Sequence, residues 1–214
     1  MPPLDRAQLP NLLTMLRGLI AVMFFIAVGF YGYPDEGVAW LWIATGLFVI
    51  GAITDFLDGH LARRWKVVSA FGRVMDPFCD KLLVMGAFVM LAGARFEVPQ
   101  WAQDGHWITN ATGVAPWMVV VMLARELFVT SARGVAESAG IEFGASWTGK
   151  AKMVLQATVI PIVLALVAAF PPGTHAWSAS IIHTLIWITV IATVVSGLPY
   201  AAAIPKLMRQ KERS

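Results

Sequence analysis

The 214-residue sequence has little charge and almost no cysteine. Charged residues make up only 14% of the chain, whereas 58% of the residues are hydrophobic. This composition lies far from the average of soluble globular proteins. The single cysteine, Cys79, excludes a disulfide within the chain and a cysteine-based metal cluster. Water is therefore not the main solvent of this protein.

The hydrophobic residues are gathered in six long runs, at residues 13–31, 38–55, 72–92, 112–133, 146–170 and 178–204. Each run is roughly 18 to 25 residues long, which is the length that an α-helix needs to cross about 30 Å of hydrocarbon. No alternation typical of strands competes with this pattern. We predict an all-α membrane protein with six transmembrane helices, and with residues 1–214 in a single integral membrane domain.

The positive charges indicate the orientation of these helices. Six spans place both ends of the chain on one side, together with the segments after the second and fourth spans. Of the 16 lysines and arginines, all except Arg95 fall on that side, including those of the short basic tail at 206–214. Cytoplasmic loops are enriched in these residues. We predict an inner-membrane protein with both termini cytoplasmic, and the net charge of +3 indicates no nucleic-acid partner.

Glycines within the hydrophobic runs have an expected packing role. Gly18, Gly29 and Gly46 lie in the first two runs. Small residues let two helix backbones approach closely within a membrane. We expect these glycines to permit close helix contacts or dimerisation.

Four aspartates lie where the second and third runs meet, within residues 55–80. Asp55 and Asp58 are three residues apart, and Asp76 and Asp80 are four apart. On helices, these spacings put each pair on one face. Carboxylates at the edge of a membrane are costly unless they are paired or bind a metal. We expect antiparallel helices to bring the two pairs together near the cytosolic surface.

Two accounts could neutralise four clustered carboxylates. Oxygen ligands select hard cations such as Mg²⁺ or Mn²⁺, and two divalent ions would balance the four charges. Two neighbouring metal ions are a recurrent arrangement for phosphoryl transfer. The other account is a salt-bridge network with the nearby cations Arg63, Arg64, Arg73 and Lys81. Helical spacing of the aspartates, with Gly59 beside them to let a phosphate approach the backbone, favours the metal.

The complete pattern resembles the signature of the CDP-alcohol phosphatidyltransferase family. Its eight fixed positions, all present at the family's spacing, are Asp55, Asp58, Gly59, Ala62, Arg63, Gly72, Asp76 and Asp80. The resemblance implies a bundle of six transmembrane helices, a homodimer, a metal site facing the cytosol, and displacement of CMP from a CDP-linked lipid by an alcohol. It also implies that the four aspartates bind metal, with Asp80 as the catalytic general base. By the same resemblance, Gly59, Ala62, Arg63 and Gly72 line the CDP site.

The acceptor alcohol is indicated by a second group of charged residues. Arg125 and Arg133 lie eight residues apart, about two helical turns, and Lys150 and Lys152 begin the fifth run. These four cations suit a phosphorylated acceptor. Arg125 lies within an apolar stretch, where a charge without a function would be costly.

The segments around these cations resemble the phosphatidylglycerophosphate synthases. The matching residues are Ala124-Arg125-Glu126 with Arg133, Ser146-Trp147-x-Gly149-Lys150-x-Lys152 with Gln156, and Asn11-Leu12-Leu13-Thr14-x2-Arg17. The resemblance implies CDP-diacylglycerol and glycerol 3-phosphate as substrates. Other acceptors remain open, namely phosphatidylglycerol as in cardiolipin synthases, inositol phosphate, or serine. A cation transporter is an alternative from a different class.

Overall fold

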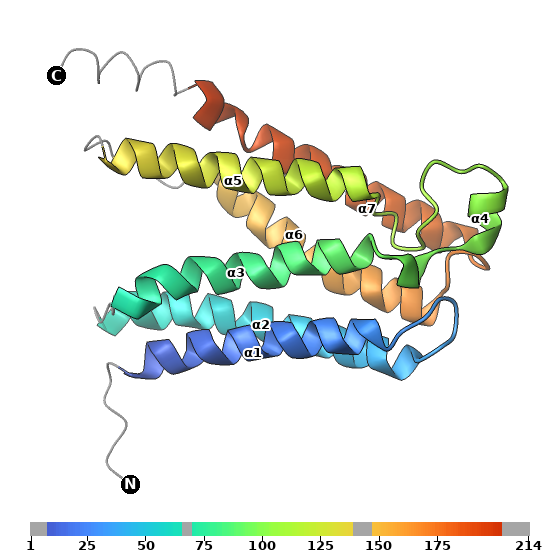
Figure 1. The fold of residues 1–214 in the computed structure, drawn as a ribbon, viewed down its shortest axis with the longest axis horizontal. Helices are drawn as coiled ribbons and strands as arrows, with labels where there is room; N and C mark the ends of the chain where they lie inside the picture. The colour runs from blue at the N-terminus through green and yellow to red at the C-terminus, as the bar shows by residue number, and fades with distance from the viewer. Residues whose placement is uncertain (1–7, 66–69, 139–146, 203–214) are drawn as a thin grey trace, which may run out of the picture.

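The computed structural model is an elongated bundle of α-helices (Figure 1). It describes residues 8–65, 70–138 and 147–202. Within these ranges, only the backbone is described at residues 8–13, 56–65, 70–74, 76, 77, 80 and 138.

Six of the helices in the described ranges are at least 20 residues long: α1 (Gln8–Gly29), α2 (Val38–Trp65), α3 (Ala70–Leu91), α5 (Pro116–Ser138), α6 (Trp147–Ala169) and α7 (Ala176–Val195). Two short helices, η1 (Ala94–Phe96) and α4 (Pro99–Gln103), lie between α3 and α5. The described ranges contain isolated β-bridges but no strand. The prediction of an all-helical chain is confirmed.

Three of the long helices are long and apolar enough to cross a membrane. Their apolar segments are Val38–Asp55, Trp147–Ala169 and Ala176–Ala202. The apolar parts of α1 and α3, at Thr14–Gly29 and Lys81–Leu91, are shorter. Helix α5 carries four charged side chains, which are Arg125, Glu126, Arg133 and Glu137. The structure therefore supports a membrane protein, and the number of six spans stays a prediction.

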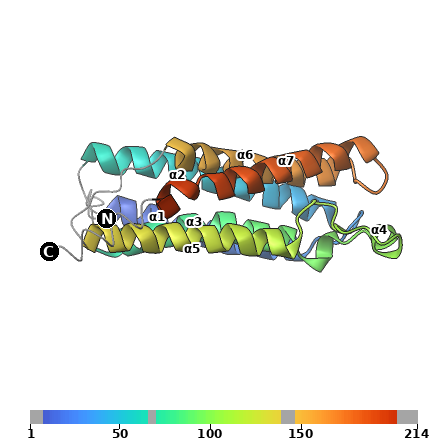
Figure 2. The same ribbon diagram turned by 90° about the horizontal axis from the view of Figure 1, so that it is seen from above.

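Successive long helices run in opposite directions along the bundle (Figure 1). Viewed from above, α2, α6 and α7 form one layer and α1, α3 and α5 form the other (Figure 2). Contacts between neighbours follow a closed ring, in the order α1, α2, α6, α7, α5, α3 and back to α1, while α3 and α6 also touch across it. One end of the bundle, here called the signature end, gathers the start of α1, the end of α2 and the start of α3 (Figure 1). The opposite end is called the loop end.

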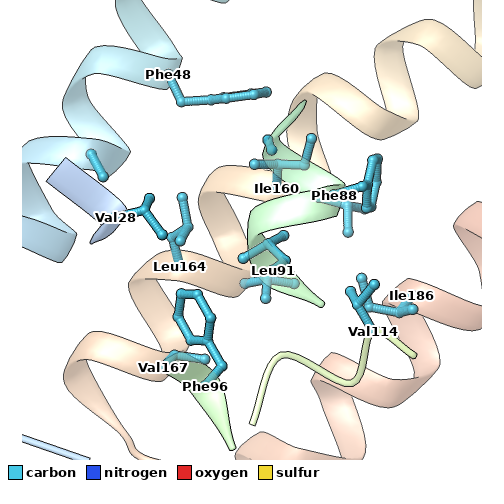
Figure 3. Packing of buried hydrophobic residues seen from close by; sticks show 14 of the residues in the cluster. Val28, Phe48, Phe88, Leu91, Phe96, Val114, Ile160, Leu164, Val167 and Ile186 are labelled. Carbon is cyan, nitrogen blue, oxygen red and sulfur yellow. The ribbon is translucent and has the colours of Figure 1, made fainter. Parts of the chain in front are cut away.

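The core lies where the two layers meet (Figure 3). Phe48 of α2, Phe88 of α3 and Leu164 of α6 are completely buried there. Many other large apolar side chains on the helices are exposed, for example Ile53 at 54% and Leu127 at 67% exposure. A surface of this kind suits a protein whose solvent is lipid.

Close helix packing depends on glycines other than those expected from the sequence. A Cβ at Gly51 of α2 would lie 2.6 Å from Leu83 Cδ2, and a Cβ at Gly86 of α3 would lie 2.3 Å from Phe25 Cζ. By contrast, a Cβ at Gly29 or Gly46 would meet nothing within 4 Å. The prediction that Gly29 and Gly46 permit close contacts inside the chain is therefore wrong, because these two positions face outward. Their role between two chains stays a prediction.

The loops at the loop end are tied to one another by hydrogen bonds. The Tyr33 backbone N–H donates to the Arg95 carbonyl oxygen at 2.9 Å, and the Gly173 N–H donates to the Tyr33 hydroxyl at 2.6 Å. The Thr112 hydroxyl donates to the Leu91 carbonyl oxygen at 2.7 Å, which joins the start of α5 to the end of α3. This end of the bundle is thus a connected unit.

Candidate active site

Both segments that carry the signature aspartates are α-helical, as the spacing predicted. Helix α2 continues past Asp55 without a break to Trp65, and α3 begins at Ala70, so both aspartate pairs lie on regular helix. The apolar segment Val38–Asp55 is 18 residues long, which corresponds to about 27 Å of helix. Residues 56–65 therefore extend the helix by about 15 Å beyond that segment.

Of the four aspartates, Asp55 alone has a described side chain. The side chains of the other signature residues lie outside the described part of the structure: Asp58, Gly59, Ala62, Arg63, Gly72, Asp76 and Asp80. Their helices place Asp58 on α2, and Asp76 and Asp80 on α3. Both segments are at the signature end (Figure 1).

Asp55 forms an ion pair that the sequence did not reveal. Arg17 of α1 donates from Nη1 to Asp55 Oδ1 at 2.8 Å. The Arg17 side chain is 3% exposed and the Asp55 side chain 26%. The described partner of Asp55 is therefore an arginine of α1, and neither Arg63 nor Lys81.

The chemistry of the signature fits a hard divalent cation. Its side-chain donors are carboxylate oxygens, and helical spacing lets each pair converge. Among the residues with described side chains, no group of three potential metal ligands is found. That search could include Asp55 but not the side chains of the other three aspartates. The oxygen donors of the signature are consistent with the expected metal.

A second polar cluster lies between α5 and α6. Glu126 Oε1 accepts a hydrogen bond from Arg125 Nη1 at 2.8 Å and also pairs with Lys152 Nζ. All three side chains are nearly buried, with exposures of 7 to 11%. One carboxylate thus contacts two cationic side chains.

The four predicted phosphate-binding cations are not all brought together. Arg125 and Lys152 meet at Glu126, whereas Arg133 donates from Nη2 to the Tyr200 hydroxyl and Lys150 is exposed. Helices α5 and α6 are not neighbours in the ring of helix contacts, so the contact depends on the long Lys152 side chain. The expectation that Arg125 has a function stays a prediction.

Neighbouring polar contacts connect this cluster with α3 and α7. The Gln156 Nε2 donates to Thr193 Oγ1 of α7 at 3.1 Å, and Gln156 is 1% exposed. Lys81, which directly follows Asp80, donates to the Thr130 hydroxyl of α5. The cation cluster and the signature helix α3 are therefore held to the same face of α5.

Sequence reasoning missed the partners that α1 and α7 supply. These are Arg17 as the partner of Asp55, and Ser196, Tyr200 and Thr193 as partners of cationic or amide side chains. Arg17 was noted only as a positive charge and as part of a resemblance. Nothing in the spacing of the α7 residues signals contact with residues about 70 positions earlier. The polar residues within these apolar helices were the available indication that such contacts exist.

Comparison with known proteins defines the class and then the family. The all-helical fold and its apolar helices place the chain in the class of membrane proteins. The family pattern of the CDP-alcohol phosphatidyltransferases matches residues 7–195. This chain belongs to the CDP-alcohol phosphatidyltransferase family, and it is an enzyme of lipid metabolism.

Several relatives are 30 to 31% identical to this chain over the aligned residues. The CDP-diacylglycerol–glycerol-3-phosphate 3-phosphatidyltransferase of Bacillus subtilis (strain 168) is 31% identical over 201 residues, covering 90% of this chain and 93% of the relative. The probable phosphatidylglycerophosphate synthase of Mycobacterium tuberculosis (strain ATCC 25618 / H37Rv) is 31% identical, covering 92% of this chain and 81% of the relative. The cardiolipin synthase (CMP-forming) of Oryza sativa subsp. japonica is 30% identical, covering 77% of this chain and 47% of the relative.

Proposed function

We propose that this enzyme transfers the phosphatidyl group of CDP-diacylglycerol to glycerol 3-phosphate and releases CMP. The product is phosphatidylglycerol phosphate. The observation that carries the acceptor assignment is that two cations from different helices, Arg125 and Lys152, are nearly buried and meet at Glu126. Cationic side chains brought together in this way suit an acceptor that already bears a phosphate. The names of the bacterial relatives support the same reaction.

On the donor side, the four aspartates are proposed to hold two Mg²⁺ or Mn²⁺ ions per subunit. When bound, the metal neutralises charge on the diphosphate and stabilises the leaving group. Asp55, Asp58, Asp76 and Asp80 supply the oxygen ligands. The glycines and Arg63 of the signature, with Ala62, are proposed to contact the CDP moiety. The oxygen-only donor set, placed on two regular helices, supports this assignment.

On the acceptor side, Arg125 and Lys152 are proposed to bind the phosphate, with Arg133 and Lys150 nearby. Asp80 then accepts the proton of the terminal hydroxyl of glycerol 3-phosphate. The hydroxyl oxygen bonds to the phosphorus that carries diacylglycerol, and the bond from that phosphorus to the CMP oxygen breaks. Lys81 links α3 to α5 through Thr130, and this contact supports a shared site for both substrates.

The proposed setting is the inner membrane, with six spans, both termini in the cytoplasm and a homodimer as the working unit. The alternating directions of the six long helices support this topology (Figure 1). Because of these directions, the start of α1 and the end of α7 lie at the same end of the bundle, the signature end. The distribution of lysine and arginine makes that end cytoplasmic.

A panel of acceptors tests the proposed reaction. The purified full-length chain is incubated with CDP-diacylglycerol, Mg²⁺ and one alcohol at a time, and CMP release is measured. We expect release with glycerol 3-phosphate. We further expect Arg125→Gln to raise the KM for glycerol 3-phosphate by about tenfold or more, since a hydrogen bond to a charged group is lost. Arg95→Gln is the matched control, because Arg95 is exposed at the loop end.

The same panel separates the alternatives. The rice relative favours phosphatidylglycerol as a second candidate acceptor. CMP release with phosphatidylglycerol, inositol phosphate or serine, but none with glycerol 3-phosphate, would contradict the acceptor assignment. Metal flux in proteoliposomes without CMP release under any condition would point to a transporter instead.

A further inference from the structure

The turn that follows α7 leaves a backbone carbonyl available for a side chain. Helix α7 ends at Val195, and Ser196 and Gly197 form a turn before the chain becomes helical again. In a continuous helix, the Tyr200 N–H would donate to the Ser196 carbonyl oxygen. Here it donates to the Gly197 carbonyl oxygen at 3.1 Å. Pro199 lies within this turn and has no N–H to continue the ladder.

The carbonyl made available in this way binds Arg125. Arg125 Nη2 donates to the Ser196 carbonyl oxygen at 3.1 Å, while its Nη1 donates to Glu126. The stem of the arginine passes directly over Gly197. A Cβ at position 197 would lie 3.2 Å from Arg125 Cγ and 3.2 Å from the Val194 carbonyl oxygen. Glycine therefore leaves the room that this arginine conformation requires.

The same turn also holds the second arginine of α5. Tyr200 is 2% exposed, and its hydroxyl accepts a hydrogen bond from Arg133 Nη2. The Arg133 guanidinium carbon lies 5.2 Å from the centre of the Tyr200 ring, within the range of a cation–π interaction. Two arginines that are eight residues apart on α5 are thus both held by the five residues from Ser196 to Tyr200.

We propose that Gly197 and Tyr200 are positioning residues for the acceptor phosphate, acting through Arg125 and Arg133. This inference rests on the proposed function, since it assigns a partner to the cations of that site. An arginine loses rotamer freedom when it binds an anion, and a fixed guanidinium has already lost part of that freedom. The turn after α7 therefore determines the affinity for glycerol 3-phosphate without touching the lipid donor.

Two variants with matched controls test the proposal by steady-state kinetics, with CMP release followed for each substrate separately. Gly197→Ala displaces Arg125, and Tyr200→Phe removes one hydrogen bond from Arg133 while keeping the ring. The control for the first is Gly134→Ala on α5, where a Cβ would meet nothing within 4 Å. The control for the second is Tyr33→Phe, which removes a hydroxyl that accepts a hydrogen bond at the loop end.

We expect Gly197→Ala to raise the KM for glycerol 3-phosphate by about tenfold, and Tyr200→Phe by roughly threefold to tenfold. The KM for CDP-diacylglycerol should stay within about twofold in both variants, and both controls should behave as the wild type. Thermal unfolding in detergent identifies a variant that has merely lost stability. If the wild type uses glycerol 3-phosphate but both variants keep its KM, the positioning role is wrong. If the wild type does not use glycerol 3-phosphate, the proposed function itself fails.

Discussion

The aspartate signature and the cation cluster differ in how the chain assembles them. The signature is local, since its eight positions lie within residues 55–80 on two consecutive helices. The cation cluster brings together residues of α5, α6 and α7 that are up to about 70 positions apart. The spacing of the aspartates predicted the first site, whereas the contacts within the second depend on how the helices pack.

The two sites also differ in the kind of charged residue that they contain. The signature sequence has four aspartates, and the described one, Asp55, pairs with Arg17. In the cluster, Arg125 and Lys152 both contact Glu126. The proposed ligands differ accordingly, because carboxylates suit a metal ion and cationic side chains suit a phosphate.

The largest expected effect tests the role of Asp80 at the signature. Asp80→Asn removes the proposed base and one metal ligand, and we expect CMP release to fall by about 10² to 10⁴. Asp104→Asn is the control, because Asp104 is exposed at the loop end. Full activity of the Asp80 variant would remove the base assignment, although not the metal site.

The next effect breaks the balance of the cation cluster. Glu126→Gln leaves Arg125 and Lys152 without their carboxylate, and removing one partner of a buried ion pair costs about 3–5 kcal/mol. We expect a lower unfolding temperature in detergent. Inorganic phosphate should recover more stability in this variant than in the wild type, because an anion then replaces the missing charge.

The control for that variant lies on the same helix. Glu137→Gln changes an exposed carboxylate of α5, so its unfolding temperature should stay close to that of the wild type. If phosphate raises the unfolding temperature equally in the wild type, Glu126→Gln and Glu137→Gln, phosphate binding by Arg125 and Lys152 is contradicted.

A smaller effect on stability is expected at Arg17, where the substitution removes a cation instead of a carboxylate. Arg17→Gln leaves the Asp55 carboxylate without its cationic partner, at a cost of about 1–3 kcal/mol. Mg²⁺ should recover more of the unfolding temperature in this variant than in the wild type, since the metal supplies the missing positive charge. Arg17→Lys keeps the charge and should fall between the two. A Mg²⁺ response identical to that of the wild type would argue against a metal beside Asp55.

The sequence was sufficient for features that depend on neighbouring residues. The hydrophobic runs located the six long helices, and the aspartate spacing placed each pair on regular helix. Boundaries were less accurate where charge ends a hydrophobic run but not a helix. Helix α2, for example, continues through the charged residues up to Trp65 because polar side chains at the membrane surface do not interrupt its backbone hydrogen bonds.

Features that depend on packing between distant helices were not predictable. Gly51 and Gly86 lie so close to a side chain of a neighbouring helix that a Cβ would clash, whereas Gly29 and Gly46 meet nothing within 4 Å. In the same way, Arg133 was expected to bind phosphate directly, whereas its described partner is Tyr200. Hydrophobic periodicity predicts which residues avoid water, but it does not predict which neighbouring helix each residue contacts. In a membrane it is less informative still, because residues that face lipid are also apolar.

The unbroken course of α2 has a mechanical consequence. Its apolar segment is long enough to cross a membrane, and the residues from Asp55 to Trp65 continue in the same helix without a break. Asp55 and Asp58 therefore keep a fixed distance along the helix axis from the apolar segment, and that distance is set by the rise of a single helix.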